Sequence, residues 1–549
     1  MECGFDLGVL MAEKRMKGAR ILIETLIKEG VTDIFGYPGG QVVDIYDELY
    51  KKKKVIKHYL TANEQGAAHA ADGYARATGK VGVVLTTSGP GATNLVTGIA
   101  NAMLDSVPIV AITGNVPTHM IGKDSFQEIN IYGITMPITK HNYFVTDISE
   151  LAYTVHEAFS VARSGRPGPV LIDIPRDIQE AIYPYDAEND SVLADVIPAE
   201  PDMHLIKKAA CEINVSKRPV IIVGGGAAKA GLTDEIEKLS ELSGAYITCT
   251  MPGLSVIPST YNRYLGLQGA NGNSEANYAV LNSDLVIGIG VRFSDKSALF
   301  MDSENGNKKI IHLDIDDAEI NKNITTDIGI VGNIKKALSE LNKIIVPRQN
   351  NDTGFMDKKV LENVASDSGT KGTPEYVFSL LNKYKSDEDL IVTDVGEHQI
   401  WAARYSRFGK PNAFLSSCGL GEMGYGIGAS IGAYVGSGRK PILITGDGSF
   451  GMSLQEMATV VTFDIPVLIL LFNNNSLGLV RQQQKNLFKE KYYATTLDRK
   501  TDFVKLAEAF GINGVKVDRI SDLETIISKN IKSKKPFFVD ITTDIEEGI

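Results

Sequence analysis

The stretch from residue 446 to residue 476, GDGSFGMSLQEMATVVTFDIPVLILLFNNNS, contains the residue types and spacing best suited to a chemical task. It predicts a strand, a glycine turn, a helix and a second strand, followed by a cluster of asparagines. In a right-handed parallel β-α-β unit, Asp447 and Asn474 would both lie at the carboxyl ends of these strands. Their carboxylate and amide oxygens suit magnesium, which commonly shares its ligand shell with phosphate groups. A GDG sequence alone often marks an ordinary turn, but its combination with Asn474 favours a magnesium–diphosphate site.

A second candidate is Glu64, which opens the helix predicted over the small-residue stretch NEQGAAHAADGYARATG. One interpretation is an ordinary first-turn carboxylate that the helix dipole stabilises. The neighbouring sequence favours another. FGYPGG, which ends at Gly40, and TTSGPGATN, residues 86–94, each place glycines where a predicted strand ends. Two glycine turns and one carboxylate at the same end of a sheet would form a crevice for a flat ligand.

Two further stretches in the last third of the chain place a helix start or glycines next to predicted strands. DVGEHQIWAAR, residues 394–404, predicts a helix whose first amides, near Glu397 and His398, would hold phosphate oxygens. CGLGEMGYGIGASIGA, residues 418–433, is dense in glycine around Met423. That methionine is either a plug in the core or a hydrophobic wedge beneath a bent ligand.

The middle of the chain contains VGGG, which ends at Gly226, between a predicted strand and a predicted helix. This arrangement suits a dinucleotide phosphate, although glycine turns are common at such places. The chain has no GxSxG sequence, no Walker loop, no histidines at metal-ligand spacing and no cysteine in a nucleophile setting. We therefore expect a bound cofactor, and not a side-chain nucleophile, to carry the chemistry.

Length and composition are those of an ordinary globular protein with about three domains, because the 549 residues are 43% hydrophobic and 22% charged. The net charge of −11, without a basic stripe, argues against a nucleic-acid partner. Four cysteines lie far apart without CxxC spacing, which argues against a thiolate zinc site and fits a reducing compartment. No apolar run approaches the roughly 18 residues of a membrane span, and no secretory leader pattern appears, so we expect a cytoplasmic protein.

Uniformly apolar strand runs alternate with helical stretches in three successive blocks, as in VGVVLTTSG, VIIVGGG and ILITGDG. Such strands are typical of parallel sheets that helices cover on both faces. The sequence therefore predicts an α/β protein of three doubly wound parallel-sheet domains, at 14–185, 200–345 and 373–549. The polar stretch 346–372 between the second and third blocks predicts a linker.

These motifs resemble those of the thiamine diphosphate-dependent enzymes, and among them of the acetolactate (acetohydroxyacid) synthase catalytic large subunits. The similarity begins at about residue 14 and covers nearly the whole chain. It includes FGYPGGQVVDIYDEL, TSGPGATNLVTGIANAMLDSVPIVAITGNV, DSFQE, GLGEMGYG and GDG with NNNS, in the order of the family. The resemblance implies a pyrimidine-binding domain, a central domain and a diphosphate-binding domain, in that order along the chain.

The resemblance also implies roles for single residues around thiamine diphosphate. Glu64 would hydrogen-bond the aminopyrimidine ring, and Met423 would support the bent shape of the cofactor. Asp447, Asn474 and the main-chain oxygen of Ser476 would hold the magnesium ion that bridges the diphosphate. Further contacts with the cofactor would come from Glu397, His398, Gly421, Gly448 and Ser449.

For the substrates, the resemblance implies an acceptor site shaped by Phe126, Gln127 and Arg176, with Gly40 near the reacting carbon. Arg176 would pair with the carboxylate of the acceptor. The chain departs from the family at Glu397, where glutamine is common. A carboxylate beside a diphosphate weakens the attraction unless it is turned away or paired.

The resemblance further implies a non-redox FAD in the central domain. Glu64 would reach a cofactor held by a partner chain, so we expect a homodimer or homotetramer with shared active sites. A regulatory small subunit is a further possible partner. The candidate FAD residues are Gly224, Gly225, Gly226, Arg292 and Asp314.

The implied reaction decarboxylates pyruvate and joins the two-carbon unit to a second 2-ketoacid, pyruvate or 2-ketobutyrate, in the first common step of branched-chain amino acid biosynthesis. One alternative is another thiamine diphosphate-dependent 2-ketoacid decarboxylase or carboligase, and DSFQE together with Arg176 favours the acetolactate reaction over it. A second alternative is a non-catalytic cofactor-binding protein. The presence of both Glu64 and the complete metal motif argues against it.

Overall fold

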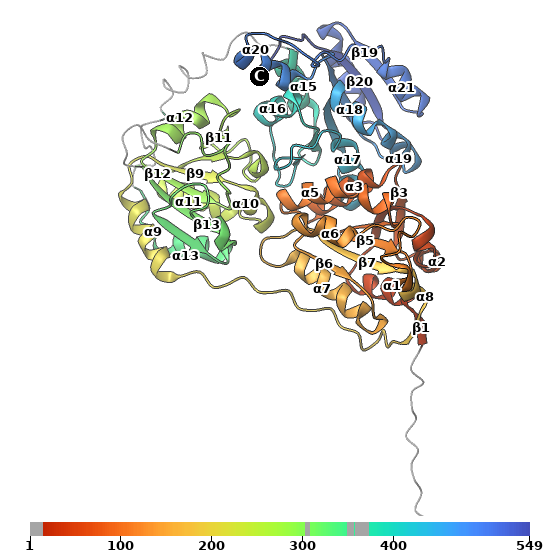
Figure 1. Ribbon diagram of the computed structural model, residues 1–549. Helices are drawn as coiled ribbons and strands as arrows, with labels where there is room; N and C mark the ends of the chain where they lie inside the picture. Colours follow the sequence, from red (N-terminus) through yellow and green to blue (C-terminus); the bar gives the residue numbers. More distant parts are fainter. Residues whose placement is uncertain (1–14, 302–307, 349–355, 357–372) are drawn as a thin grey trace, which may run out of the picture.

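The computed structural model describes residues 15–301, 308–348, 356 and 373–549. These residues form three six-stranded sheets in which every strand pair is parallel, and Figure 1 shows each sheet covered by helices. The prediction of three doubly wound α/β domains is therefore confirmed. Most of the predicted linker at 346–372 lies outside the described residues.

The N-terminal domain contains one parallel sheet and a small antiparallel ribbon. Its strands are β1 (Arg15–Lys17), β2 (Asp33–Tyr37), β3 (Lys57–Leu60), β4 (Gly82–Thr86), β5 (Ile109–Asn115), β6 (His141–Phe144), β7 (Val170–Pro175) and β8 (Ile182–Pro184). Its helices are α1 (Gly18–Lys28), α2 (Val43–Lys52), α3 (Glu64–Thr78), α4 (Pro90–Thr93), α5 (Val96–Leu104), α6 (Ile131–Thr135), α7 (Leu151–Arg163) and α8 (Arg176–Glu180). The sheet has the order β3-β2-β4-β5-β7-β6, and β1 pairs with β8. Every residue of β4, β5 and β7 is buried, which explains their uniformly apolar sequences.

The central domain has a different strand order. Its strands are β9 (Pro219–Val223), β10 (Tyr246–Cys249), β11 (Tyr264–Leu267), β12 (Leu285–Ile289), β13 (Lys309–Asp314) and β14 (Ile328–Val331). Its helices are α9 (Met203–Val215), α10 (Gly225–Ala230), α11 (Thr233–Ser243), α12 (Ser274–Asn282) and α13 (Ile334–Ile344). The order β11-β10-β9-β12-β13-β14 places three strands on each side of the boundary between β9 and β12. Such a boundary opens a crevice for a ligand at the carboxyl ends of the strands.

The C-terminal domain repeats the strand order of the N-terminal domain. Its strands are β15 (Leu390–Thr393), β16 (Phe414–Ser416), β17 (Pro441–Gly446), β18 (Leu468–Asn473), β19 (Asn513–Val517) and β20 (Phe537–Thr542). Its helices are α15 (Thr373–Tyr384), α16 (Glu397–Tyr405), α17 (Gly426–Ser437), α18 (Asp447–Ser453), α19 (Met457–Thr462), α20 (Gly478–Phe488), α21 (Phe503–Ala509) and α22 (Leu523–Asn530). The sheet order is β16-β15-β17-β18-β20-β19. The predicted β-α-β unit is present, with its helix divided into α18, the 3₁₀ turn η7 (Leu454–Glu456) and α19.

The N-terminal and C-terminal domains meet where α3 packs against α17, which Figure 1 shows as neighbouring helices of the two domains. The contact is between backbones. A Cβ atom on Gly432 would overlap the carbonyl oxygen of Ala70, and one on Gly73 would overlap that of Ala429. The small residues of both helices therefore permit an approach that no larger side chain would allow.

Helices that are long and apolar enough to span a membrane are absent from the described ranges.

We expect Gly432→Ala to lower the free energy of unfolding by about 3 kcal/mol, at the upper end of overpacking effects, because a carbonyl oxygen cannot rotate away from the added methyl group. Equilibrium unfolding in urea measures this change. Ser437→Ala, at the end of the same helix, should change the free energy by less than about 1 kcal/mol. Equal losses in the two variants would contradict the proposed backbone contact.

Candidate functional site

A cavity of about 180 Å³ lies at the carboxyl ends of β17 and β18 in the C-terminal domain. Asp447 begins α18 directly after β17, and Asn474 follows β18, so the predicted β-α-β geometry brings both to this cavity. The residues of this domain predicted to bind the cofactor or its metal all line it: Glu397, His398, Gly421, Met423, Asp447, Gly448, Ser449, Asn474 and Ser476.

Asp447 places a buried carboxylate at this cavity. Its residue is only 3% exposed, and it forms no ion pair with the described part of the chain. Burial raises the pKa of its carboxyl group to about 6. A bound cation would compensate this desolvation. The available donors are a carboxylate, the amide oxygen of Asn474 and the carbonyl of Ser476, which together suit a hard ion such as magnesium.

Groups of three or more His, Cys, Asp and Glu side chains able to hold a metal are absent from the described residues. A metal at this cavity would therefore depend on amide and main-chain oxygens in addition to Asp447.

Glu397 lines the cavity, and its carboxyl group is held by two neighbours there. Its Oε2 accepts a hydrogen bond from Nδ2 of Asn474 at 3.1 Å, and a Cβ atom on Gly478 would overlap its carboxyl group. The carboxyl group therefore lies against the start of α20. Burial raises the pKa of Glu397 to about 7, so that this group is partly protonated at neutral pH. Partial protonation and the contact with Asn474 reduce the repulsion between Glu397 and a bound diphosphate.

His398 presents a free ring nitrogen at the same cavity. The residue is buried, and its Nε2 has no hydrogen-bond partner among the described residues. Burial lowers the pKa of the imidazole to about 3, so the ring is neutral. A buried, neutral nitrogen without a partner at a cavity wall is suited to a hydrogen bond with a ligand oxygen.

Met423 lines the cavity as a partly exposed residue, which favours the hydrophobic wedge over the core plug. Its Cε atom lies 3.5 Å from the position that a Cβ on Gly448 would take. The methionine thus lies over the GDG turn. Gly421 and Gly424, on either side of it, adopt positive φ angles of 72° and 88°. These angles favour glycine and explain the glycine-dense sequence of this loop.

Glu64 lies at the first position of α3 in the N-terminal domain. The Oδ1 atom of Asn63 accepts a hydrogen bond from the amide of Gln65 at 2.8 Å and so caps the helix. The Oε2 atom of Glu64 accepts a hydrogen bond from Nδ2 of Asn94 at 2.9 Å. A Cβ on Gly91 would lie 3.4 Å from Oε1 of Glu64. The carboxylate is therefore next to the predicted TTSGPGATN turn.

The two glycine turns predicted to form a crevice do meet. The amide of Gln41, next to Gly40, donates to Oγ1 of Thr87 at 3.3 Å. Gln127 lies against the same turn, because a Cβ on Gly89 would be 2.9 Å from its carbonyl oxygen. Space next to Gly40 is open, since a Cβ there would have no neighbour within 4 Å. The structure thus brings Gly40, Glu64 and Gln127 to one end of the sheet.

The other two predicted substrate residues are placed differently. Phe126 is 84% exposed. The Nε atom of Arg176 lies 2.8 Å from Oε1 of Glu180 and 3.9 Å from Oδ2 of Asp44, so its charge is already paired. Gln179, in the same helix as Arg176, donates to the carbonyl of Gln41 at 2.8 Å and connects α8 to the Gly40 turn. Convergence of Phe126 and Arg176 on one acceptor pocket remains a prediction.

The cavity of the C-terminal domain is lined by residues between 395 and 480, and Glu64 is not among them. Within the described part of one chain, the Asp447 cluster and the Glu64 cluster therefore do not share a cavity.

A larger cavity, of about 530 Å³, opens at the β9/β12 boundary of the central domain. Four of the five predicted FAD residues line it: Gly225, Gly226, Arg292 and Asp314. Gly224 does not line the cavity. A Cβ there would overlap the carbonyl oxygen of Gly290, so this glycine allows the ends of β9 and β12 to pack closely, and its contact with FAD stays a prediction. Burial raises the pKa of Asp314 to about 6.

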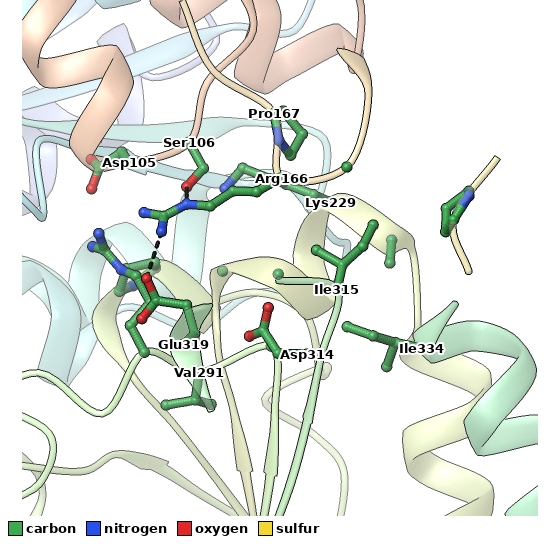
Figure 2. A pocket seen from close by; sticks show the side chains of 18 of the residues that line it. Asp105, Ser106, Arg166, Pro167, Lys229, Val291, Asp314, Ile315, Glu319 and Ile334 are labelled. Atoms are coloured by element: carbon green, nitrogen blue, oxygen red, sulfur yellow. Dashed lines mark hydrogen bonds and ion pairs between the residues drawn. The ribbon is translucent and has the colours of Figure 1, made fainter. Parts of the chain in front are cut away.

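Charged residues that the sequence did not predict also line this cavity, and Figure 2 shows several of them. Arg166 donates to Oγ of Ser106 at 2.8 Å and pairs with Glu319 at 2.6 Å. Lys229 forms no ion pair with any described residue. A sequence signal existed for both, since Lys229 follows the VGGG turn by three residues and Arg166 lies in the GRPGPV turn before β7. The glycine turn and the basic side chains fit a ligand that contains phosphate.

Comparison with known proteins matches three family models to successive parts of the chain. Residues 16–134 match the N-terminal TPP binding domain of thiamine pyrophosphate enzymes, residues 206–341 match their central domain, and residues 394–541 match their C-terminal TPP binding domain. The chain is 42% identical to an acetolactate synthase of Arthrospira platensis, over 98% of this chain and 96% of that protein. It is 41% identical to a probable acetolactate synthase large subunit of Methanocaldococcus jannaschii (97% and 93%) and 40% identical to a chloroplastic acetolactate synthase of Nicotiana tabacum (97% and 83%).

The raised pKa of Glu397 predicts a pH dependence of stability in the protein freed of metal by a chelator. Its folded value of about 7 exceeds the ordinary 4.5, so the folded state binds the proton more tightly than the unfolded chain. Stability is therefore full below the unfolded value and is lost as pH rises through about 7. We expect a loss of about 2 kcal/mol between about pH 5 and pH 8, and Glu397→Gln should remove it.

Urea unfolding across this pH range measures the effect. Glu508→Gln removes an exposed glutamate of the same domain and should leave the pH dependence of the original protein intact. A Glu397→Gln protein whose stability still falls with pH as steeply as the original would show that the burial of Glu397 is not the cause.

Proposed function

The chain belongs to the thiamine pyrophosphate enzymes and, among them, to the acetolactate synthases, and we propose that it joins the two-carbon unit of pyruvate to a second 2-ketoacid, pyruvate or 2-ketobutyrate. The observation that carries the proposal is the cavity lined by all nine residues predicted to contact the cofactor or its metal from the C-terminal domain. When bound, thiamine diphosphate supplies a carbon nucleophile for the keto group and an electron sink for the loss of carbon dioxide. The relatives named acetolactate synthase favour this reaction over a decarboxylase that releases acetaldehyde.

We propose that Asp447, Asn474 and the carbonyl of Ser476 hold a magnesium ion that binds the diphosphate. The buried carboxylate of Asp447 forms no ion pair with the described residues, and the three donors line one cavity. Nε2 of His398, in the tautomer that protonates it, would donate a hydrogen bond to a phosphate oxygen, and the first amides of α16 would face the same group. Met423 would occupy the apolar side of the cofactor over the GDG turn.

Glu64 would hold a proton at a ring nitrogen of the aminopyrimidine. Asn94 donates to one of its carboxylate oxygens, which fixes the plane of the group and leaves Oε1 beside Gly91. The absence of a side chain at Gly91 and at Gly40 lets a flat ring approach the backbone. Gly40 and Gln127 would then lie near the reacting carbon.

A homodimer completes the active site in this proposal. The Glu64 cluster and the Asp447 cavity are separate within one chain, and apolar residues around both are exposed, Phe126 at 84% and Met452 at 56%. Helix α20, whose first residues line the cavity, has no buried residue. A second copy that covers these surfaces would bring its own Glu64 to the cofactor. A homotetramer would contain two such pairs.

Three further parts of the proposal concern FAD, a second subunit and location. The backbone of Gly225 and Gly226, with Lys229 and Arg292, would bind the phosphates of FAD in the 530 Å³ cavity.

The relative from Methanocaldococcus jannaschii is named a large subunit, which supports a regulatory small subunit here. The three cysteines in the described residues are free, as expected in the cytoplasm.

The test of the reaction is to incubate the purified protein with pyruvate, thiamine diphosphate and magnesium, with and without FAD, and to identify the product. Acetolactate supports the proposal, whereas acetaldehyde as the main product would identify a decarboxylase. Activity that needs added FAD would support the flavin site, and full activity of flavin-free protein would contradict it.

We expect Asp447→Ala to weaken magnesium-dependent binding of thiamine diphosphate by about 100-fold, because a metal ligand is lost. Titration of the cofactor at fixed magnesium, followed by protein fluorescence, measures the affinity. Asp502→Ala removes an exposed carboxylate of the same domain and should leave the affinity unchanged. Normal affinity in Asp447→Ala would refute the metal site.

Glu64→Gln should keep the fold and the cofactor affinity but lower turnover by about 100-fold or more, as expected for loss of a positioned acid–base group. Steady-state kinetics at saturating cofactor give turnover, and the titration above gives affinity. An unchanged turnover number would exclude the role assigned to Glu64.

A further inference from the structure

The start of α3 is held by a carboxylate from the other end of the chain. The Oε2 atom of Glu456 accepts a hydrogen bond from the amide of Ala62 at 3.2 Å, and Oε1 accepts one from the amide of Asn63 at 3.0 Å. These two amides directly precede Glu64. Glu456 belongs to η7 of the C-terminal domain, and its residue is 0% exposed.

A carboxylate suits this position because the first amides of a helix have no partner within the helix and carry partial positive charge. Asn63 accepts from the amide of Gln65, and Glu456 accepts from the amides of Ala62 and Asn63. Oγ1 of Thr459 donates to Oε2 of Glu456 at 2.7 Å and fixes the orientation of the acceptor. Both oxygens of Glu456 are therefore engaged, and two of the three bonds are with the chain next to Glu64.

Gly66 provides the space that this contact needs. A Cβ atom at Gly66 would overlap Oε1 of Glu456. The φ angle of Gly66 is not in the left-handed region, so its lack of a side chain matters for this approach and not for a turn. The carboxylate therefore fits between the first turn of α3 and the amides that precede it.

We propose that Glu456 is a positioning residue, which fixes the backbone at Glu64 and so directs the Glu64 carboxylate into the crevice. Glu456 lies nine residues after Asp447, at the end of the helical segment that begins at the Asp447 cavity. The C-terminal domain of each chain thus sets the geometry of the acid–base group of that chain. The inference rests on the proposed role of Glu64.

A double-mutant cycle of Glu456→Gln and Glu64→Gln tests the proposal through turnover. Glutamine keeps the size of Glu456, but its NH₂ group would face one of the two backbone N–H donors. We expect Glu456→Gln to lower kcat by about 10-fold through a small displacement of Glu64. KM and the affinity for thiamine diphosphate with magnesium should change by less than about twofold. In the Glu64→Gln background, Glu456→Gln should lower kcat no further.

The proposal would be overturned if the fold losses of kcat in the two single variants multiplied in the double variant, because Glu456 would then act independently of Glu64. A parallel loss of kcat and cofactor affinity would also overturn it, by indicating a structural role alone. If Glu64→Gln itself leaves turnover unchanged, the proposed function of Glu64 fails. If Glu64→Gln lowers turnover and Glu456→Gln does not, only the positioning role fails.

Asp284 offers a matched control in the central domain. Its carboxylate also accepts two consecutive backbone amides, those of Lys217 and Arg218, and the hydroxyl of Ser216. Asp284→Asn should lower stability without changing kcat. Gly66→Ala is a second test, which keeps the glutamate at position 456 but displaces its carboxyl group. It should reproduce the selective loss of kcat. A normal kcat in folded Gly66→Ala protein would contradict the positioning role.

Discussion

The backbone contact between α3 and α17 is the constraint on which the arrangement of the N-terminal and C-terminal domains depends. At Gly73 and Gly432 the two helices are too close for any side chain. Ion pairs with buried carboxylates lie around this contact, and one of them, His69–Glu422, crosses the domain boundary. His69 and Glu422 form a 2.7 Å pair, and Arg76 binds both Asp72 and Asp105. Such pairs need accurate geometry, because a buried charge that loses its partner is strongly destabilising.

The same boundary supports the loop that carries Met423. The carboxylate of Asp105 accepts hydrogen bonds from the amides of Cys418 and Gly419 at 2.9 and 2.8 Å. The hydroxyl of Ser417 donates to Asn101 and accepts from the amide of Glu422. Asp105 also lines the larger cavity of the central domain. One side chain thus contacts both the glycine loop of the diphosphate cavity and the proposed flavin cavity, so the three domains are coupled at this point.

The sequence predicted the parts of the site that lie close together along the chain. Asp447 and Asn474 are joined by one β-α-β unit, whose geometry is almost independent of the rest of the protein. Glu64 with its two glycine turns was found for the same reason, since each turn ends a buried strand. At Gly224 the sequence cannot separate two roles, because a glycine turn after a strand has the same sequence whether it faces a phosphate or a neighbouring strand.

Contacts between distant segments could not be predicted in this way. Glu456 lies nearly 400 residues after the amides that it binds, and nothing in the local sequence SLQEMA distinguishes it from a solvated helix residue. The pairing of Arg176 with Glu180 and Asp44 likewise depends on how α8 packs. The raised pKa of Glu397 depends on burial, which is a property of the folded domain.

The identical strand orders of the N-terminal and C-terminal sheets explain why one chain contains two separate half-sites. β2, β3, β4 and β5 correspond to β15, β16, β17 and β18 in these orders. The segments that follow them correspond as well: the Gly40 turn to the start of α16, the Glu64 segment to the Met423 loop, and the TTSGPGATN turn to the GDG turn. Helices α3 and α17, which form the contact between the domains, are themselves equivalent. Two domains of the same topology that meet through equivalent helices are arranged approximately like the two subunits of an isologous dimer, in which both subunits use the same surface. Each domain then keeps its own ligand-binding edge, which accounts for the separation of Glu64 from the Asp447 cavity and supports the homodimer proposed above.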